Sequence, residues 1–554
     1  MKNTLYYGDN LTIMQGLPRH SVDLIYLDPP FKSQQNYNLL YRTLTGKPIP
    51  EQEEAFCDTW NMDAQKDELA RNMPVLMREY GVSNEMVDFW ALWMKALRKT
   101  QPHLLAYLIY MVQRLLHMRV ILRPTGSIYL HCDPAASHYI KVMMDAIFDH
   151  NNFRSELIWK RTSSHNSAKR WGPVHDTILF YTASSRYTWN RVSQPYDKDY
   201  VASFYKHEDE LGKSYRLGDL TGAGTRSGES GRPWRGVNPT DSGRHWAVPG
   251  IPGKTKEEIK ALTVQERLDA LDELKLIYWP KRGSIPQFKR YFDESKGVAA
   301  QDIITDIDPL SPHASEKMGY PTQKPIELLE RIIKASSNPG DVVFDPFCGC
   351  GTTIYAAERT QRKWIGCDVA ILAVRLIRER LTDRYHLTEG SQFEVKGVPN
   401  SVDSAQALFK TDPFQFQHWA VERVEGYPTA KKTGDQGIDG KLYFETRDGL
   451  RDMVLSVKGG MVRPTDIRDL RGVLEREDNA ELAGFISLQE PSKAMREEAE
   501  RAGFYTYNGL NYRRIQLLTI KEIVEDKKQF HTPSKVRSRT VRGQASFNYD
   551  TVSA

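Results

Sequence analysis

Short apolar runs that stop at a polar residue recur along the chain. One such run covers residues 24–27, and Asp28 follows it directly. Four β-favouring residues in a row predict a buried strand, and the two prolines after Asp28 must end that strand. The carboxylate is therefore expected at the carboxyl end of a strand, which is the place where open α/β sheets bind their ligands.

The residues at this strand end suit a planar base that carries an exocyclic amino group. Asp28 and the carbonyl of Pro29 or Pro30 can accept the two N–H bonds of such a group. Phe31 can stack on the ring. The polar residues that follow predict a loop, which is either a lid over the ligand or ordinary surface. These four residues, 28–31, are the candidate catalytic residues.

The same pattern of a strand followed by an acid returns after residue 320. Residues 341–345 predict a strand, and a turn that contains Gly349 and Gly351 leads from it into a helix. The next predicted strand ends in Asp368. This βαβ unit is typical of a nucleotide-binding site, because glycines let the backbone approach a cofactor and the terminal acid can bind ribose hydroxyls.

The segment after the first motif is mostly helical in pattern. Residues 50–123 predict core helices, and residues 127–131 predict another buried strand. The apolar run 104–122 contains several charged residues, which favours a buried helix over a membrane span. The triplet His131-Cys132-Asp133 is not a metal site, because adjacent residues of a strand point to opposite faces.

Basic and aromatic residues alternate in the middle of the chain. Between 154 and 246 arginine and lysine are frequent, glycine is abundant after 215, and the tryptophans are Trp159, Trp171, Trp189, Trp234 and Trp246. A run of charge is usually a solvated face, but guanidinium groups with interleaved aromatic rings suit phosphates and base edges. The segment 154–318 therefore predicts a nucleic-acid-binding insert.

Length and composition set the wider limits. The 554 residues suggest roughly three to four domain-sized units. The net charge of +5 is too small to establish a nucleic-acid partner by itself. Five scattered cysteines without a CxxC motif favour a reducing compartment over a zinc site or a disulfide framework. No apolar signal segment precedes the first strand, so we expect a cytoplasmic protein without a membrane association.

Three motifs together resemble those of the amino-DNA methyltransferases. They are Asp-Pro-Pro-Phe at 28–31, Pro-Thr-Gln-Lys-Pro at 321–325 and Phe-Asp-Pro-Phe-Cys-Gly-Cys-Gly-Thr-Thr at 344–353. The catalytic motif precedes the cofactor motif, and the basic insert lies between them. That order resembles the circularly permuted β-class enzymes of restriction–modification systems, and the likeness covers about residues 1–385.

The resemblance implies a Rossmann-like α/β fold and a methyl transfer that depends on S-adenosyl-L-methionine. The methyl group would pass in line to the amino nitrogen of a flipped base in double-stranded DNA, without a covalent enzyme intermediate. The Asp-Pro-Pro form of the motif favours N6 of adenine, and N4 of cytosine stays the alternative. The cofactor-binding residues that the resemblance implies are Asp9, Thr322, Lys324, Asp345, Phe347, Gly349, Gly351 and Asp368.

A second α/β pattern begins beyond Gly397 and resembles the Mrr-type fold of the PD-(D/E)xK nucleases. The matching residues are Asp439 in Gly-Ile-Asp-Gly and Lys458 in Ser-Val-Lys-Gly-Gly. In those nucleases Mg²⁺ is bound by the aspartate and by an acidic or amide residue two positions before the lysine, and that position is Ser456 here. Serine is a weak ligand for a hard cation, so we expect a DNA-binding or regulatory relic. A combined restriction–modification enzyme with an active, Mg²⁺-dependent nuclease is the alternative.

The sequence therefore predicts five parts. They are a catalytic half 1–153, a target-recognition insert 154–318, a cofactor-binding half 319–395, a nuclease-like domain 396–530 and a basic, disordered tail 531–554. The expected partner is double-stranded DNA, and a homodimer or a separate restriction subunit stays open. No metal ligand is assigned outside the nuclease-like residues. A DNA-binding protein with an inactive methyltransferase fold is the alternative from another class.

Overall fold

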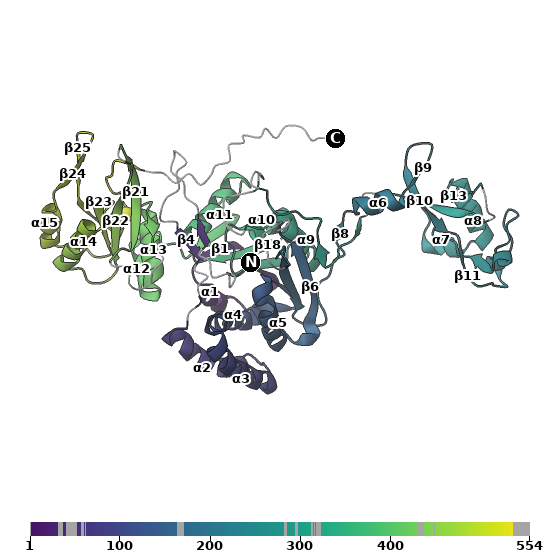
Figure 1. Ribbon diagram of the computed structural model, residues 1–554, viewed down its shortest axis with the longest axis horizontal. Helices are drawn as coiled ribbons and strands as arrows, with labels where there is room; N and C mark the ends of the chain where they lie inside the picture. The colour runs from purple at the N-terminus through teal and green to yellow at the C-terminus, as the bar shows by residue number, and fades with distance from the viewer. Residues whose placement is uncertain are drawn as a thin grey trace. The chain divides into compact units, whose positions relative to one another are not determined.

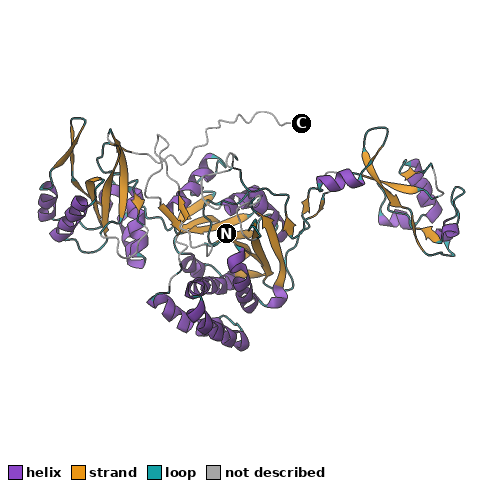
Figure 2. Cartoon of the chain, in the orientation of Figure 1, coloured by secondary structure: helices purple, strands orange, loops and turns teal. Residues whose placement is uncertain are grey.

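The computed structural model divides the chain into two compact units. One unit is formed by Met1–Asn190 with Gln301–Ala554, and the other by Arg191–Ala300. Figure 1 traces the chain and Figure 2 marks its helices and strands. The residues that the structure describes are 2–30, 37–39, 53–56, 60, 62–162, 171–281, 285–293, 297–311, 314, 316, 323–429, 437–447 and 449–535.

A nine-stranded mixed sheet forms the centre of the larger unit. In spatial order its strands are β16 (Ile303–Ile304), β6 (Phe153–Lys160), β7 (His175–Thr182), β5 (Leu122–Cys132), β2 (Val22–Leu27), β17 (Val342–Asp345), β18 (Lys363–Asp368), β1 (Asn3–Tyr7) and β19 (Phe393–Lys396). Strand β7 is antiparallel to β5 and to β6. The other neighbouring pairs are parallel.

The sheet order brings together strands that lie far apart in the sequence. Strand β2 pairs with β17, and β17 pairs with β18, which in turn pairs with β1. Because these four strands are parallel, their carboxyl ends meet at one edge of the sheet. The predicted strands at 24–27, 341–345 and 364–368 are confirmed, and each of them delivers its acid to this edge.

Both faces of the sheet are covered by helices (Figure 1). Along β2, Leu24 and Tyr26 pack on the side of α9 (Ile326–Ser336), α10 (Thr352–Arg359) and α11 (Ile371–Asp383). The alternate residues Ile25 and Leu27 pack on the side of α1 (Asn10–Gly16), α4 (Pro102–Ile121) and α5 (Pro134–Phe148). A strand that is buried on both faces explains why its residues form a continuous apolar run.

The helical prediction for residues 50–123 is right except at its beginning. The structure has α2 (Ala64–Glu79), α3 (Asn84–Thr100) and α4 there, but residues 53–56 form β4, which pairs with β3 (Tyr37–Leu39). Helix α4 is the one helix of the described residues that is long and apolar enough to cross a membrane. Most of it is buried inside the larger unit, and a core helix has the same composition.

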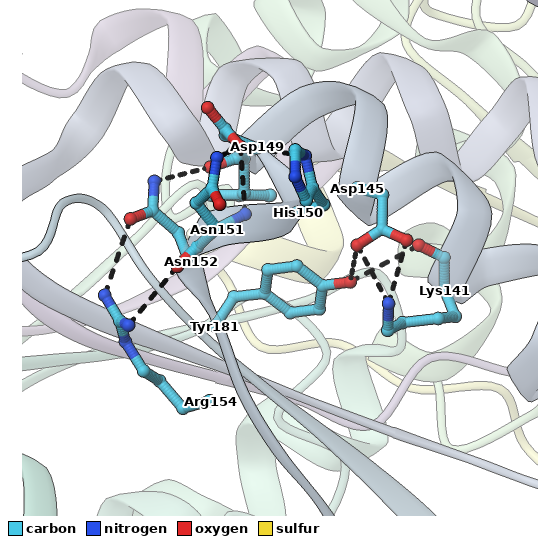
Figure 3. A network of polar contacts seen from close by, with 9 residues as sticks. Lys141, Asp145, Asp149, His150, Asn151, Asn152, Arg154 and Tyr181 are labelled. Carbon is cyan, nitrogen blue, oxygen red and sulfur yellow. Dashed lines mark hydrogen bonds and ion pairs between the residues drawn. The ribbon is translucent and has the colours of Figure 1, made fainter.

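A polar network fastens α5 to the far edge of the sheet, away from the carboxyl ends (Figure 3). Asp145 accepts hydrogen bonds from Lys141 Nζ, at 2.9 and 2.8 Å, and from the Tyr181 hydroxyl, at 2.7 Å. Arg154, on β6, donates to Thr182 Oγ1 at 2.9 Å and to the carbonyl of Ser184 at 3.0 Å. Arg154 opens the segment predicted to bind nucleic acid, and here its guanidinium connects β6 to the end of β7 and the residues after it.

The smaller unit contains a four-stranded antiparallel sheet beside a hairpin and short helices. Its elements are α6 (Lys198–Phe204), β9 (His207–Glu208), β10 (Ser214–Asp219), β11 (Thr221–Ala223), β12 (Arg244–Trp246), α7 (Lys256–Lys260), α8 (Val264–Glu273), β13 (Ile277–Tyr278) and β14 (Gln287–Tyr291). Strands β8 (Ser193–Gln194) and β15 (Val298–Ala299) pair where the chain enters and leaves the unit. The unit is narrower than the segment 154–318, because β6, β7 and β16 belong to the central sheet.

Tryptophans form the core of the smaller unit. Trp234 and Trp246 are buried, with ring centroids 6.0 Å apart, and they pack with Leu268 and Leu271. Trp234 Nε1 donates to Asp269 Oδ1 at 2.9 Å. These two rings therefore belong to the core and are not available to stack on a base, while the nucleic-acid role of the segment stays a prediction.

The C-terminal part folds around a second mixed sheet, which confirms the α/β pattern expected there. The sheet order is β20 (Tyr427–Pro428), β21 (Gly440–Thr446), β22 (Gly449–Lys458), β23 (Ala480–Ser487) and β26 (Ile515–Thr519). The hairpin is β24 (Phe504–Tyr507) with β25 (Leu510–Arg513), and the helices are α12 (Val402–Thr411), α13 (Pro413–Arg423), α14 (Pro464–Arg476), α15 (Lys493–Glu500) and α16 (Ile520–Val524).

The first residues of the predicted disordered tail are part of this sheet. Strand β27 (Ser534–Lys535) pairs with β21, opposite Phe444 and Glu445. The backbone of residues 534–535 is therefore ordered, in contrast to the prediction for 531–554. Residues 536–554 lie outside the described part of the chain.

Candidate active site

Asp28 follows β2 at the carboxyl edge and forms an ion pair that the sequence did not predict. Lys324 Nζ lies 2.5 Å from Asp28 Oδ2, and the lysine side chain is only 7% exposed. Lys324 had been assigned to the cofactor pocket. The structure instead places its ammonium on the candidate catalytic carboxylate. Pro29 is buried and Pro30 is half-buried beside this pair. The other candidates in the two motifs, Phe31 and Thr322, lie outside the described residues.

Asp345 ends β17 and is buried next to the strand of Asp28. Its Oδ1 accepts a hydrogen bond from Phe347 N at 3.0 Å. Burial raises the pKa of Asp345 to about 7, and repulsion from Asp28 and Asp368 adds to this, although hydrogen bonds from Thr353 and Phe347 oppose it. This coupling shows that the three carboxylates lie close enough together to sense one another.

Asp368 ends β18 and holds the turn that follows β17. Its Oδ2 accepts a hydrogen bond from Gly349 N at 2.8 Å, and its Oδ1 accepts one from Ala370 N at 2.9 Å. Burial raises the pKa of Asp368 to about 6 despite these bonds. The same turn is joined to β18 a second time, because Cys348 N donates to the carbonyl of Cys367 at 3.0 Å.

Gly351 makes this turn compact. It begins α10 with a φ of 84°, a left-handed conformation that side chains rarely adopt. A Cβ atom at this position would lie 2.6 Å from Ile377 Cγ1. The helix therefore starts directly at the sheet edge, and the backbone from Phe347 to Gly351 lines the space beside Asp345 and Asp368.

Asp9 follows β1 at the same edge, and both of its oxygens are engaged. Oδ1 caps α1 by accepting from Leu11 N at 2.9 Å, and Oδ2 lies 2.7 Å from Arg114 Nη2. Asn10 accepts from Arg114 Nε at 2.6 Å and donates to the carbonyl of Pro346 at 2.9 Å. These contacts connect the turn after β1 to the turn after β17, so Asp9 helps to hold the two turns together.

This acidic edge fits a ligand that carries positive charge. Burial raises the pKa values of Asp345 and Asp368. The negative charges of Asp28 and Asp368 raise the pKa of Asp345 further, because like charges disfavour the ionised form. A sulfonium and an amino group, both of which S-adenosyl-L-methionine carries, would relieve that repulsion. Asp345, Asp368 and the backbone of residues 347–351 are the groups that would hold it.

A buried chain of hydrogen bonds behind Asp28 was missed by the sequence. Burial raises the pKa of Tyr26, so its hydroxyl keeps its proton and donates to His131 Nδ1 at 2.7 Å. His131 Nε2 lies 3.1 Å from Asp176 Oδ2. Asp176 Oδ1 lies 3.3 Å from Arg161 Nε. Tyr26 lies near the end of β2, two positions before Asp28, and the alternation of side chains along the strand was the available signal.

The described cysteines are not activated nucleophiles. Cys132, Cys348, Cys350 and Cys367 are buried and unbridged. Burial raises the pKa of Cys350 to about 11 and raises the pKa of the other three thiols as well. A thiolate is the reactive form of cysteine, so none of these four is poised to attack a base.

The nuclease-like residues of the C-terminal sheet do not form a comparable cluster of acids. Asp439 is buried, and its Oδ2 accepts a hydrogen bond from Val457 N at 2.7 Å. Ser456 and Lys458 share one face of β22, with Ser456 buried and Lys458 half-buried. Among the described residues, no group of three or more His, Cys, Asp or Glu side chains could hold a metal ion.

Comparisons with known proteins match most of the chain before the C-terminal sheet. The DNA methylase family (N6_N4_Mtase) matches residues 22–379. Type II methyltransferase M.EcaI of Enterobacter cloacae is 34% identical over 276 residues, which are 50% of this chain and 57% of that protein. The Mod subunit of the type III restriction-modification enzyme StyLTI of Salmonella typhimurium is 27% identical over 395 residues, 66% of this chain and 52% of that protein.

A third relative is matched over most of its length. DNA adenine methyltransferase YhdJ of Escherichia coli K12 is 22% identical over 413 residues, which are 74% of this chain and 93% of that protein. The chain spans about half the length of the two relatives named before it.

Proposed function

The chain belongs to the DNA methylase family that matches residues 22–379, and on that premise we propose that it transfers a methyl group from S-adenosyl-L-methionine to N6 of adenine in double-stranded DNA. The observation that carries the proposal is the convergence of Asp28, Asp345 and Asp368 at the carboxyl ends of the adjacent parallel strands β2, β17 and β18. One strand end would hold the base, and the other two would hold the methyl donor.

The chemistry follows from what Asp28 and the prolines can accept. An exocyclic amino nitrogen is a poor nucleophile, because its lone pair is delocalised into the ring. Asp28 would accept one N–H bond of this group, and the carbonyl of Pro29 or Pro30 would accept the other. Both bonds would favour a more tetrahedral nitrogen, whose lone pair would form the N–CH₃ bond as the S–CH₃ bond breaks. The sulfur would leave as a neutral thioether, and the methylated nitrogen would release one proton to water. The bound cofactor supplies the methyl group on a positively charged sulfur.

The cysteines support direct transfer to the nitrogen. A covalent route would need a thiolate near the base, and the four described thiols are buried with raised pKa values. Positioning and electrostatics would then supply the catalysis.

Adenine is favoured over cytosine as the target. The Asp-Pro-Pro form of the motif at 28–30 supports it, and so does the match to the E. coli DNA adenine methyltransferase over 74% of this chain. The order of the motifs, with β2 before β17 in the chain, supports the circularly permuted β-class arrangement.

The remaining parts of the chain would assist this reaction. The unit Arg191–Ala300 is proposed to contribute to target recognition. The C-terminal sheet is proposed as a nuclease-like fold without cleavage, because the hydrogen bond from Val457 N occupies one oxygen of Asp439 and Ser456 brings no charge. A separate restriction subunit is a proposed partner, since a relative is itself a Mod subunit. We place the protein in the cytoplasm, where its DNA would lie.

Incubation of unmethylated genomic DNA with isotope-labelled S-adenosyl-L-methionine, followed by nucleoside analysis, tests the proposal. We expect label in N6-methyladenine. Label in N4-methylcytosine would correct the target base, and absence of label from both nucleosides would overturn the proposal. Sequencing of the labelled DNA then identifies the site, which the sequence does not specify.

A further inference from the structure

The ion pair between Asp28 and Lys324 conflicts with the role proposed for Asp28. Lys324 Nζ lies 2.5 Å from Asp28 Oδ2, so the ammonium already uses an acceptor that the amino group of a base needs. A charged donor competes strongly with a neutral one for the same oxygen. The lysine must therefore yield this oxygen when a base binds.

A buried ammonium cannot simply lose its carboxylate. Lys324 is 6% exposed, and removing the partner of a buried charge is strongly unfavourable. A second anion within reach of the lysine side chain would lower the cost of the exchange.

Asp176 is that second anion. It is the second residue of β7, which is antiparallel to β5, so it lies at the carboxyl edge of the parallel strands. Burial opposes its ionisation, yet the pKa of Asp176 is lowered overall, by the hydrogen bond and charge of His131 and then by the positive charges of Lys324 and Arg161. Asp176 lies two residues before Ile178, which packs on the same face of the sheet as Tyr26, and the Tyr26–His131–Asp176 contacts connect this carboxylate to the strand that ends next to the Asp28–Lys324 pair.

The groups around Asp176 keep it in place. His131 Nε2 at 3.1 Å and Arg161 Nε at 3.3 Å contact its two oxygens. Tyr26 fixes the other side of the His131 ring at 2.7 Å. Tyr26 lies near the end of β2, two residues before Asp28. The chain of contacts therefore starts next to the Asp28 carboxylate and ends at the Asp176 carboxylate.

We propose that Lys324 is a positioning residue with two carboxylate partners: it pairs with Asp28 before a base binds, and it moves to Asp176 when the amino group of the base takes its place on Asp28. This inference rests on the proposed function. The exchange lets Asp28 stay paired while no base is present. It also moves a positive charge away from a nitrogen that becomes positive during methyl transfer.

A fixed structural ion pair would behave differently. In that case Asp176 would support His131 only, and its loss would impair the site whether or not Lys324 were present. With the exchange, the loss of Asp176 matters because Lys324 then stays on Asp28. Removal of Lys324 should therefore repair the defect.

The test measures base flipping with 2-aminopurine placed next to the target adenine in a duplex that carries the mapped site, because its fluorescence rises when its neighbour leaves the stack. We expect Asp176→Asn to lower the flipped fraction about tenfold, as for the loss of one charge-assisted contact. The single-turnover rate should fall with it. The double variant Asp176→Asn with Lys324→Met should flip the base at least as well as the wild type. A double variant as impaired as Asp176→Asn alone would overturn the proposal.

A second duplex adds a control for the chemistry of the base. Purine in place of the target adenine has no amino group to compete with Lys324, so Asp176→Asn should leave its flipping unchanged. An equal defect with purine would contradict the exchange. Lys334→Met is the matched protein control, since Lys334 lies on α9, is half-exposed and pairs with Glu330. It should change neither measurement.

Two further measurements separate the outcomes. Cofactor affinity of each variant, by calorimetry, reports whether the site has stayed folded. If Asp176→Asn fails this check, Lys324→Met alone decides, and a flipped fraction below that of the wild type would contradict the competition. If the wild type labels no DNA, the proposed function fails. If it labels DNA and Asp176→Asn flips and methylates normally, only the exchange fails.

Discussion

Two regions of this chain place an aspartate at the end of a sheet, and they differ in what surrounds it. At the acidic edge, acids that follow or end β1, β2, β17 and β18 converge; burial raises the pKa values of Asp345 and Asp368, and repulsion from Asp28 and Asp368 raises that of Asp345 further. In the C-terminal sheet, Asp439 is bonded to the backbone of Val457, with Ser456 where a metal-binding nuclease would place a carboxylate or amide. The contrast shows that convergence of charges from several strands, and not a single motif, marks a site ready for chemistry.

The largest expected effect is a loss of methyl transfer on substitution of Asp28 that substitution of Asp439 does not cause. Asp28→Ala removes an acceptor of the base's amino group, so methyl transfer should fall by about a hundredfold or more, while cofactor affinity changes by less than about threefold. Asp439→Ala should leave methyl transfer unchanged. Single-turnover transfer and calorimetry measure both quantities. Equal losses in the two variants would remove the distinction between the regions.

Substitution of one glycine in each region should change the free energy of unfolding in opposite directions. Gly351→Ala puts a Cβ atom 2.6 Å from Ile377 Cγ1 at a φ of 84°, so it should destabilise the fold by about 1–3 kcal/mol. It should also weaken cofactor binding. Gly472, on α14 of the C-terminal part, has no neighbour within 4 Å of an added Cβ. Gly472→Ala should stabilise by about 0.5–1 kcal/mol. Urea unfolding measures both changes.

The pH dependence of cofactor affinity should report the acidic edge. The pKa of Asp345 is raised to about 7 and that of Asp368 to about 6. A cationic ligand prefers the ionised forms, so affinity should rise between about pH 5.5 and 8, by about tenfold for one carboxyl. Asp345→Asn should flatten the upper part of this rise. Affinity that is constant with pH would contradict the assignment.

The same two groups set the sign of the stability change in the absence of ligand. Their pKa values are higher in the folded protein than in an unfolded chain, where a carboxyl titrates near 4. The folded state is therefore stabilised by protonation. This contribution is complete below about pH 4 and is lost as the pH rises through 6 to 7. Melting temperatures with and without cofactor should diverge over that interval.

The smallest effect is expected from divalent metal. Addition of Mg²⁺ or of a chelator should change methyl transfer by less than about twofold, because no group of three or more metal-ligating side chains among the described residues could hold a metal ion. Gel analysis should show no Mg²⁺-dependent cutting of unmethylated DNA. Cutting that is lost in Asp439→Ala and Lys458→Ala would make the two regions equivalent and restore the combined restriction–modification enzyme.

Much of the acidic edge could be predicted from the sequence, because each strand and the acid at its end are adjacent in the chain. The strands that end in Asp28, Asp345 and Asp368 are apolar runs stopped by an acid, and each was expected where it occurs. Contacts between strands could not be predicted in this way. Tyr26, His131 and Asp176 meet only because β2, β5 and β7 are neighbours, and no spacing in the sequence expresses that order.

In the insert, the composition of the sequence did not predict which side chains are buried. Trp234 and Trp246 stand among arginines and glycines, a composition that suits a nucleic-acid surface, yet both rings are buried. Without a clear period of 2 or 3.6, a segment does not reveal which side chains face inward. Arg235 is likewise engaged, with Asp269 and Asp272 on α8. Composition alone cannot distinguish a small core from a binding surface.

The order of strands in the central sheet has a consequence for synthesis of the protein. Strand β2 leaves the ribosome early, but its neighbour β17 begins at Val342, so at about 5–20 residues per second the two are made about 20–60 s apart. During that interval the strand that bears Asp28 lacks the partner that completes its binding edge. A nascent chain therefore cannot complete the edge that carries Asp28 until its cofactor-binding half has been translated, and the C-terminal sheet is still to be made at that point.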